Sequence, residues 1–220
     1  MNKLAKLLGV SRRPVADQIL VLLLCADVLL IIIHLLRWET IYYQTNHFAI
    51  TREGVIGDLF QYLKEFWLIV LFMYFGIKRA NAMLVMWSLI FFYFLADDSL
   101  KWHEEMGLVV ANMLQLPWML GLHPEFQGQV VYAFVLAFVF FGVTGLLAFM
   151  RGRDAIYFSV RMFVLLGLLA LFAGIIDWIY PLFDDKWVRP SIASVEEGGE
   201  MIVLSIIVWF VLSSLQEGKQ

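Results

Sequence analysis

Six long apolar stretches divide the chain, and each has the length that a helix needs to cross a membrane. About 20 apolar residues in a helix span the roughly 30 Å of hydrocarbon in a bilayer. We expect such helices at residues 18–38, 59–77, 80–100, 129–150, 156–180 and 196–215. With 62% hydrophobic and 16% charged residues and a mean hydropathy of +0.80, the chain is far from a soluble domain. The sequence therefore predicts an all-α fold, a polytopic integral membrane helical bundle in a single domain over residues 1–220.

Residues 106–122 form a further apolar stretch that does not fit the pattern of the other six. This stretch carries Asn112, Gln115 and Pro117, its length is borderline for a span, and a proline interrupts a helix. Three interpretations stay open at this point: a seventh span, a re-entrant segment or an interfacial helix.

The basic residues predict the orientation of the bundle, because Lys and Arg accumulate in short cytoplasmic loops. With six spans and residues 106–122 not crossing, ten of the sixteen Lys and Arg residues fall on one side. If that stretch crossed, Arg151 and Arg153 would face outward and the bias would weaken. We therefore expect a multi-pass protein of the inner membrane with both termini in the cytoplasm. In this topology, the acids that end the third and fifth spans and begin the sixth meet at the external face.

The first acidic stretch, residues 96–106, sets six ionisable groups directly after the apolar third span. In a continuous helix its carboxylates would form two parallel pairs, Asp97 with Glu104 and Asp98 with Glu105. His103 lies five residues after Asp98, about 140° around a helix of about 3.6 residues per turn, so it needs a local break to join either pair. In the purely structural interpretation, Lys101 pairs with the acids four residues away and the remaining charges are solvated at a membrane exit.

The second acidic stretch, residues 196–200, opens the last predicted span after a loop over residues 181–195. Ser194 followed three residues later by Glu197 is a capping-box pattern, which explains Glu197 structurally. Glu196 and Glu200 are four apart on one face, and capping does not explain them. Asp177, at the outer end of the fifth span, faces a cavity or a partner, or pairs with a basic residue of the following loop.

Three further ionisable residues lie inside predicted spans. Asp27 is close to the middle of the first span, so it must be neutral, hydrogen-bonded or paired. His34 follows seven residues later on nearly the same face, and a hydrogen bond to another helix is the common role of such a histidine. Glu65, in the second span, either pairs with its neighbour Lys64 or reaches inward.

The two acidic stretches also carry a resemblance. Asp97-Asp98 is followed after four residues by His103-Glu104, and the later stretch reads Glu196-Glu197-Gly198-Gly199-Glu200. From the third span onward, the chain resembles a broad group of uncharacterised bacterial polytopic membrane proteins. In that group a third or fourth span ends in D-[DE]-x4-H-E, and a last span opens with E-[ED]-G-x-E. The resemblance implies that the two stretches belong together, and it carries no activity.

These residues lead to a preferred hypothesis about function. Carboxylates with one or two imidazoles suit Ca, Mg or Mn, and with more histidine iron or zinc. We expect an external cluster that binds a divalent metal ion or relays protons in a small transporter or channel. Its predicted members are Asp98, His103, Glu104, Glu196, Glu200 and Asp177. Deeper stations on the same path are predicted at Asp27, His34 and Glu65.

Two other classes of function stay open. The chain is an accessory or scaffold subunit of a larger membrane complex if the acids serve only as salt bridges and caps. It is a membrane hydrolase if a bound metal activates a water molecule. No HExxH, GxSxG or phosphate-loop motif decides whether it is an enzyme. The expected partners are the lipid bilayer and either further copies of the chain or another membrane protein. The net charge of −3 and the lack of a basic stripe argue against nucleic acid.

Overall fold

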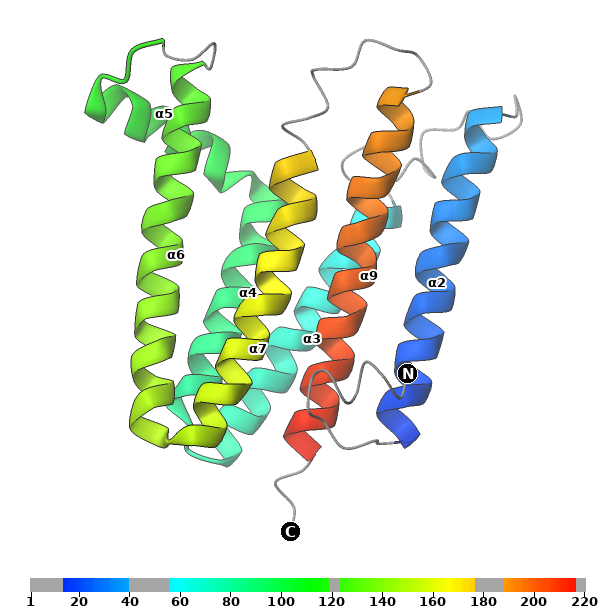
Figure 1. Cartoon of the computed structure of the whole chain (residues 1–220), viewed down its shortest axis with the longest axis vertical. Coiled ribbons are helices and arrows are strands. Elements are labelled where there is room, and N and C mark those ends of the chain that lie inside the picture. The colour runs from blue at the N-terminus through cyan, green and yellow to red at the C-terminus, as the bar shows by residue number, and fades with distance from the viewer. Residues whose placement is uncertain (1–13, 40–55, 119–122, 177–187, 217–220) are drawn as a thin grey trace. The chain divides into compact units, whose positions relative to one another are not determined.

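The structure is a computed structural model that describes residues 14–39, 56–118, 123–176 and 188–216, and this part of the chain is helical with no strand. The helices run in order along the chain (Figure 1). They are α2 (Pro14–Glu39), α3 (Ile56–Lys78), α4 (Ala82–Leu100), α5 (Trp102–Leu114), α6 (Pro124–Arg151), α7 (Arg153–Ala170), the π-helix η3 (Leu171–Ile176) and α9 (Val188–Gln216).

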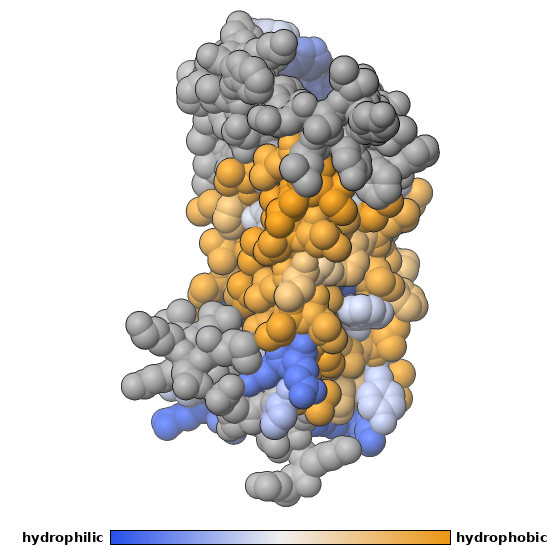
Figure 2. Space-filling model, turned by 90° about the vertical axis from the view of Figure 1, so that its right-hand side faces the viewer, coloured by the Kyte–Doolittle hydropathy of each residue, from blue (hydrophilic) through white to orange (hydrophobic). Residues whose placement is uncertain are grey.

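In the described part of the chain, six helices are long and apolar enough to cross a membrane. These candidate spans are Pro14–Leu35, Ile56–Lys78, Ala82–Leu100, Pro124–Arg151, Arg153–Ala173 and Ser194–Leu215. For the residues that the structure describes, the prediction of an all-helical fold with six such helices is confirmed. The molecule also exposes apolar side chains such as Leu22 on α2 and Phe138 on α6. Figure 2 shows hydrophobic side chains gathered in a broad band on one face, as a multi-pass membrane protein requires.

The chain forms two compact units. The first unit, residues 1–68 and 160–220, contains α2, the first half of α3, most of α7 with η3, and α9. Within it α9 is buried along most of its length and packs antiparallel against α2 (Figure 1). Near the end of α9, the Trp209 indole Nε1 donates to Asp17 Oδ1 at 3.0 Å, and the Gly198 position near its middle contacts Ile31. These two contacts fix the register of α2 on α9.

The second unit, residues 69–159, contains the rest of α3, α4, α5, α6 and the start of α7. α3 and α4 form a tight helical hairpin, because α3 ends at Lys78 and α4 begins at Ala82. The Asn81 side chain caps α4 by accepting a hydrogen bond from the Met83 amide at 3.1 Å. Phe72 stacks on the Phe91 ring with centroids 5.8 Å apart, so aromatic packing joins the two helices.

Three element boundaries differ from the sequence-based expectations. α9 begins at Val188, so the loop predicted up to residue 195 is wrong over its second half. Pro190 is compatible with this start, because a proline in the first turn of a helix has no amide to leave unpaired. Ser194 and Glu197 then lie inside the helix, and the predicted capping box is wrong. The fifth span widens into η3 after Ala170, and Asp177 lies outside the described residues.

The described part of residues 106–122 does not form a seventh span. α5 has 13 residues, which at about 1.5 Å per residue is about 20 Å and too short to cross the hydrocarbon. Gln115 ends it in the left-handed conformation with φ 48°. The seventh-span interpretation therefore fails for α5, and the interfacial and re-entrant ones stay open.

Candidate functional site

The first unit contains a buried ion pair. The Lys64 ammonium on α3 lies 2.5 Å from Oδ1 of Asp27 on α2, and neither side chain is exposed. The hydroxyl of Ser205, on α9, donates to the other oxygen, Asp27 Oδ2, at 2.6 Å. We call Asp27, Lys64 and Ser205 the Asp27 cluster. Three helices thus supply one residue each, and both carboxylate oxygens are held.

The Lys64 ammonium has further partners besides the carboxylate. It donates to the Met201 carbonyl oxygen at 2.8 Å. This carbonyl is in the middle of α9, and a carbonyl oxygen accepts a second hydrogen bond through its other lone pair. The ammonium also lies 4.4 Å from the centroid of the Phe60 ring, within cation–π range. A carboxylate, a carbonyl and an aromatic face together replace the water that this charge would otherwise bind.

The energetics of such a pair indicate that stability alone is a poor reason for it. Moving each ion from water into an apolar interior costs several kcal/mol even after relaxation, and the mutual attraction repays about that much. Apolar side chains of similar volume are often as stable or more stable in such positions. Ionisable groups within candidate membrane spans therefore point to either a functional path or a device that specifies how helices pair.

The other residues predicted along the inner path are also buried. His34 lies on α2, on nearly the same face of the helix as Asp27, and Glu65 follows Lys64 on α3. Their burial agrees with the expectation that they face the bundle interior. Their role as stations on a path stays a prediction.

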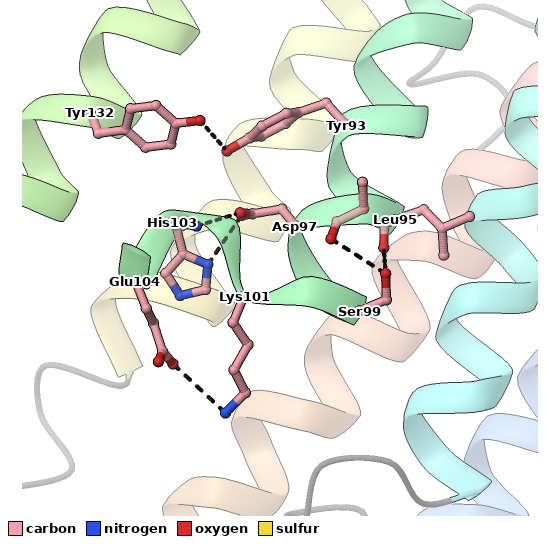
Figure 3. Close-up of polar contacts among 9 residues, drawn as sticks. Tyr93, Leu95, Asp97, Ser99, Lys101, His103, Glu104 and Tyr132 are labelled. Atoms are coloured by element: carbon pink, nitrogen blue, oxygen red, sulfur yellow. Dashed lines mark hydrogen bonds and ion pairs between the residues drawn. The ribbon is translucent and has the colours of Figure 1, made fainter. Parts of the chain in front are cut away.

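The first acidic stretch forms a different arrangement from the one that its spacing predicts (Figure 3). α4 ends at Leu100, and Lys101 adopts the left-handed conformation with φ 56° and ψ 38° before α5 begins. Asp97 Oδ1 accepts a hydrogen bond from the His103 amide at 2.7 Å. Asp97 Oδ2 lies 3.2 Å from His103 Nδ1. The Asp97 carboxylate thus caps the start of α5 and holds the His103 imidazole.

We call this arrangement of Asp97 and His103 the Asp97–His103 junction. The predicted continuous helix, which would have aligned the carboxylates in two parallel pairs, is wrong. The local break that His103 needs is present at Lys101, and it turns the imidazole toward Asp97. Lys101 Nζ lies 3.8 Å from Glu104 Oε1 with both side chains well exposed, which makes this a weak pair. The hydrogen bond to Asp97 raises the pKa of His103 against the opposing effect of burial, and the charges of nearby acids add to the rise.

The predicted metal site is divided between the two units. Asp98, His103 and Glu104 belong to the second unit, Glu196 and Glu200 belong to the first, and Asp177 is not described. Within the described ranges, no three His, Cys, Asp or Glu side chains form a group suited to hold a metal ion. Convergence of the two acidic stretches therefore stays a prediction.

The glycines of the second acidic stretch have a packing role. A Cβ at Gly199 would lie 2.2 Å from Cδ1 of Phe172 on η3, and one at Gly198 would lie 2.9 Å from Cδ1 of Ile31 on α2. The glycine pair therefore lets α9 approach both neighbours closely. Glu196 and Glu200, on either side, are partly buried.

Sequence reasoning missed two members of the Asp27 cluster. Lys64 is visible as a charge inside a span, but its neighbour Glu65 is the obvious local partner. Ser205 is one of several serines in apolar surroundings, and nothing in its neighbourhood marks it. The usable signal was the acid at residue 27 in an apolar span, which calls for a hydrogen-bond or charge partner on another helix.

Comparison with known proteins gives one result. Neither a curated protein nor a solved structure matches the chain. The family model described as "Domain of unknown function (DUF8692)" matches residues 20–215. This match includes the Asp27 cluster and both acidic stretches, and it covers most of the chain. The chain therefore belongs to the DUF8692 family.

Proposed function

We propose that the protein is a small membrane transporter or channel that relays protons through Asp27 and Lys64. One observation carries this proposal: a carboxylate and an ammonium, both fully buried, meet within candidate membrane spans on separate helices. Ionisable groups in this position mark ion or proton pathways in membrane proteins. Elsewhere in the interior, the burial of His34 and Glu65 supports them as further stations.

The chemistry of the pair suits proton transfer. Moving one proton from Lys64 Nζ to Asp27 Oδ1 along their hydrogen bond turns two buried ions into an amine and a carboxylic acid. The net charge of the pair stays at zero, so this step leaves no isolated ion in the apolar interior. Ser205 keeps a hydrogen bond to Asp27 Oδ2 in either state, because a hydroxyl both donates and accepts. Release and uptake of the proton then require access to Asp27 from one side at a time.

Proton flux into proteoliposomes tests this function. The purified protein is reconstituted with a pH-sensitive dye inside, and a potassium diffusion potential drives protons inward. We expect acidification with the unmodified protein and its loss in Asp27→Asn. Asp17→Asn is the matched control on the same helix, because its amide oxygen still accepts the Trp209 hydrogen bond. Flux no greater than in protein-free vesicles, or undiminished flux in Asp27→Asn, contradicts the proposal.

The metal-binding version of the function is tested separately. We propose that Asp98, His103, Glu104, Glu196 and Glu200, with Asp177, hold a divalent cation at the external face, with both termini cytoplasmic. Elemental analysis of detergent-purified protein, with His103→Ala and Glu200→Ala alongside, measures this directly. A stoichiometric metal that both variants lose supports the site, and no metal in the unmodified protein removes it. A metal-dependent membrane hydrolase needs the same ion, so this measurement tests that alternative as well.

An accessory or scaffold subunit is the second candidate function, and α6 supports it. Apart from the neighbouring residues and backbone of α6 itself, no described atom lies within 4 Å of a Cβ built at Gly142 or Gly145, so a partner helix has room to approach closely there. Purification in a mild detergent, followed by native mass spectrometry, tests this candidate. A stoichiometric partner protein favours a subunit role, and a monomer that conducts protons by itself contradicts it.

A further inference from the structure

α5 carries an apolar stripe on the side that faces away from α6. The stripe consists of Trp102, Met106, Val109 and Met113, whose exposed fractions lie between 36% and 81%. Their spacing of i, i+4, i+7 and i+11 puts them on one face of the helix. On the opposite face Gly107 and Ala111 are buried. α5 therefore has two apolar faces: one is packed in the protein, and the other is exposed.

The packing of α5 against α6 is close and fixes its position. A Cβ at Gly128 of α6 would lie 2.0 Å from the Gly107 carbonyl oxygen, so the two backbones touch. The Asp97–His103 junction fixes the other end, because Asp97 holds the first turn of α5. α5 thus runs from the end of α4 to the beginning of α6, both of which are candidate membrane spans. The apolar stripe consequently lies beside the ends of two candidate membrane spans.

The residues around the stripe match the chemistry of a membrane surface. Tryptophan is enriched at the membrane–water interface, and Trp102 begins the stripe while Trp118 follows the helix and is well exposed. Glu105 and Asn112 border the stripe on one side, and both are exposed. An apolar face bordered by polar groups is typical of a helix that lies in the interface plane. The first turn of α5 carries Glu104 and Glu105, with Lys101 before it, so no net positive charge near the stripe attracts anionic lipid.

We propose that α5 lies in the membrane–water interface, with the stripe from Trp102 to Met113 buried among lipid acyl chains. The lipid bilayer is the partner, and apolar area rather than charge drives the contact. This surface is independent of the Asp27 cluster. Of the two interpretations left for residues 106–122, this proposal selects the interfacial helix for residues 106–114, the part that belongs to α5.

Spin-label accessibility tests this placement. A nitroxide is attached at Met113→Cys in a Cys25→Ser background and reconstituted in phosphatidylcholine vesicles. Collision with oxygen reports lipid, and collision with a water-soluble nickel chelate reports water. Glu105→Cys is the matched control on the polar border of α5, and Phe138→Cys, 83% exposed in the middle of α6, is the lipid reference. We expect the oxygen-to-nickel ratio at 113 to exceed that at 105 and to stay below that at 138. Adding phosphatidylglycerol leaves the ratio unchanged.

Two results overturn the proposal. Nickel collisions at 113 as frequent as at 105 place the stripe in water. An immobilised label at 113 that meets neither reagent means that protein covers the stripe, and dilution with unlabelled protein then separates a second copy from another partner. Each variant is first compared with the parent in gel filtration. If Met113→Cys does not fold, Val109→Cys reports on the same face.

Discussion

Lys64 Nζ lies 2.5 Å from Asp27 Oδ1, and neither side chain is exposed to solvent. We predict that Asp27→Leu or Lys64→Met alone destabilises the protein by about 3–5 kcal/mol, because either leaves a buried charge unpaired. The double variant carries no charge at this place and is expected to be neutral or stabilised by up to about 4 kcal/mol. Denaturant unfolding in mixed micelles measures all three. Additive destabilisation in the double variant would show that the two residues do not form a pair.

Substituting Ser205 tests the hydrogen bond to the second oxygen of the Asp27 carboxylate. Its hydroxyl donates to Asp27 Oδ2 at 2.6 Å, whereas the equally buried Ser88 donates to a neutral carbonyl, that of Ile69, at 2.9 Å. Hydrogen bonds to charged groups are stronger, so we expect Ser205→Ala to cost about 1–2 kcal/mol and the control Ser88→Ala about 0.5–1. Unfolding in the same micelles compares them. Equal losses contradict an ionised Asp27.

The contact between α5 and α6 depends on a glycine. We expect Gly128→Ala to destabilise the protein by about 1–3 kcal/mol, because its Cβ would meet backbone that has no room to shift. Gly145→Ala, on the same helix, is the control, because its new Cβ would meet no described atom within 4 Å beyond the neighbouring residues and backbone of α6 itself. It should stabilise by about 0.5–1 kcal/mol through its better helix propensity. Thermal unfolding distinguishes the two signs, and a Gly128→Ala variant as stable as its parent contradicts the close packing.

The Asp97–His103 junction should lose stability as the pH rises. The pKa of His103 is raised above its ordinary value of 6.5 in the folded protein, chiefly by the hydrogen bond to Asp97. The stabilisation is therefore fully present below the ordinary value and is lost as the pH rises through the raised one. The His103 side chain is 42% exposed, so screening by solvent keeps the effect small.

Melting temperatures in metal-free buffer measure this effect. The difference between the unmodified protein and His103→Gln should be larger at about pH 6 than at about pH 9. In an Asp97→Asn background the same comparison should show a much smaller dependence on pH, because the largest cause of the raised pKa of His103 is gone. A difference that grows toward high pH would contradict the assignment of the pair.

The six long helices are predictable from the sequence because length and apolar character are properties of the chain alone. The second span, expected at residues 59–77, is observed at Ile56–Lys78. The start of α9 is less predictable. Pro190 and Ser191 have the composition of a loop, but a proline in the first turn of a helix is tolerated, so α9 can begin at Val188.

The Asp27 cluster is only partly predictable, for a geometric reason. That Asp27 needs a partner follows from its place in an apolar span. Which residue supplies it depends on the rotation and register of three helices, which packing contacts such as Gly198 on Ile31 determine. A single sequence contains the residues but not the register.

The Asp97–His103 junction could not be predicted, because the helix break that creates it has no glycine to mark it in the sequence. A left-handed residue between two helices is most often glycine, whereas here it is Lys101. The Asp97 carboxylate holds the turn by accepting the His103 amide and facing its ring. A spacing argument that assumes one continuous helix cannot show this.

Proton flux through the doubly substituted Asp27→Leu/Lys64→Met protein tests the central claim most directly. This variant removes both titratable groups and leaves no unpaired charge in the interior. A loss of proton flux can therefore be told apart from a loss of the fold. We predict a folded protein, with a melting temperature equal to or above that of the parent, that carries no more protons into proteoliposomes than protein-free vesicles do. Flux equal to that of the unmodified protein would contradict the account and would leave the ion pair with a purely structural role.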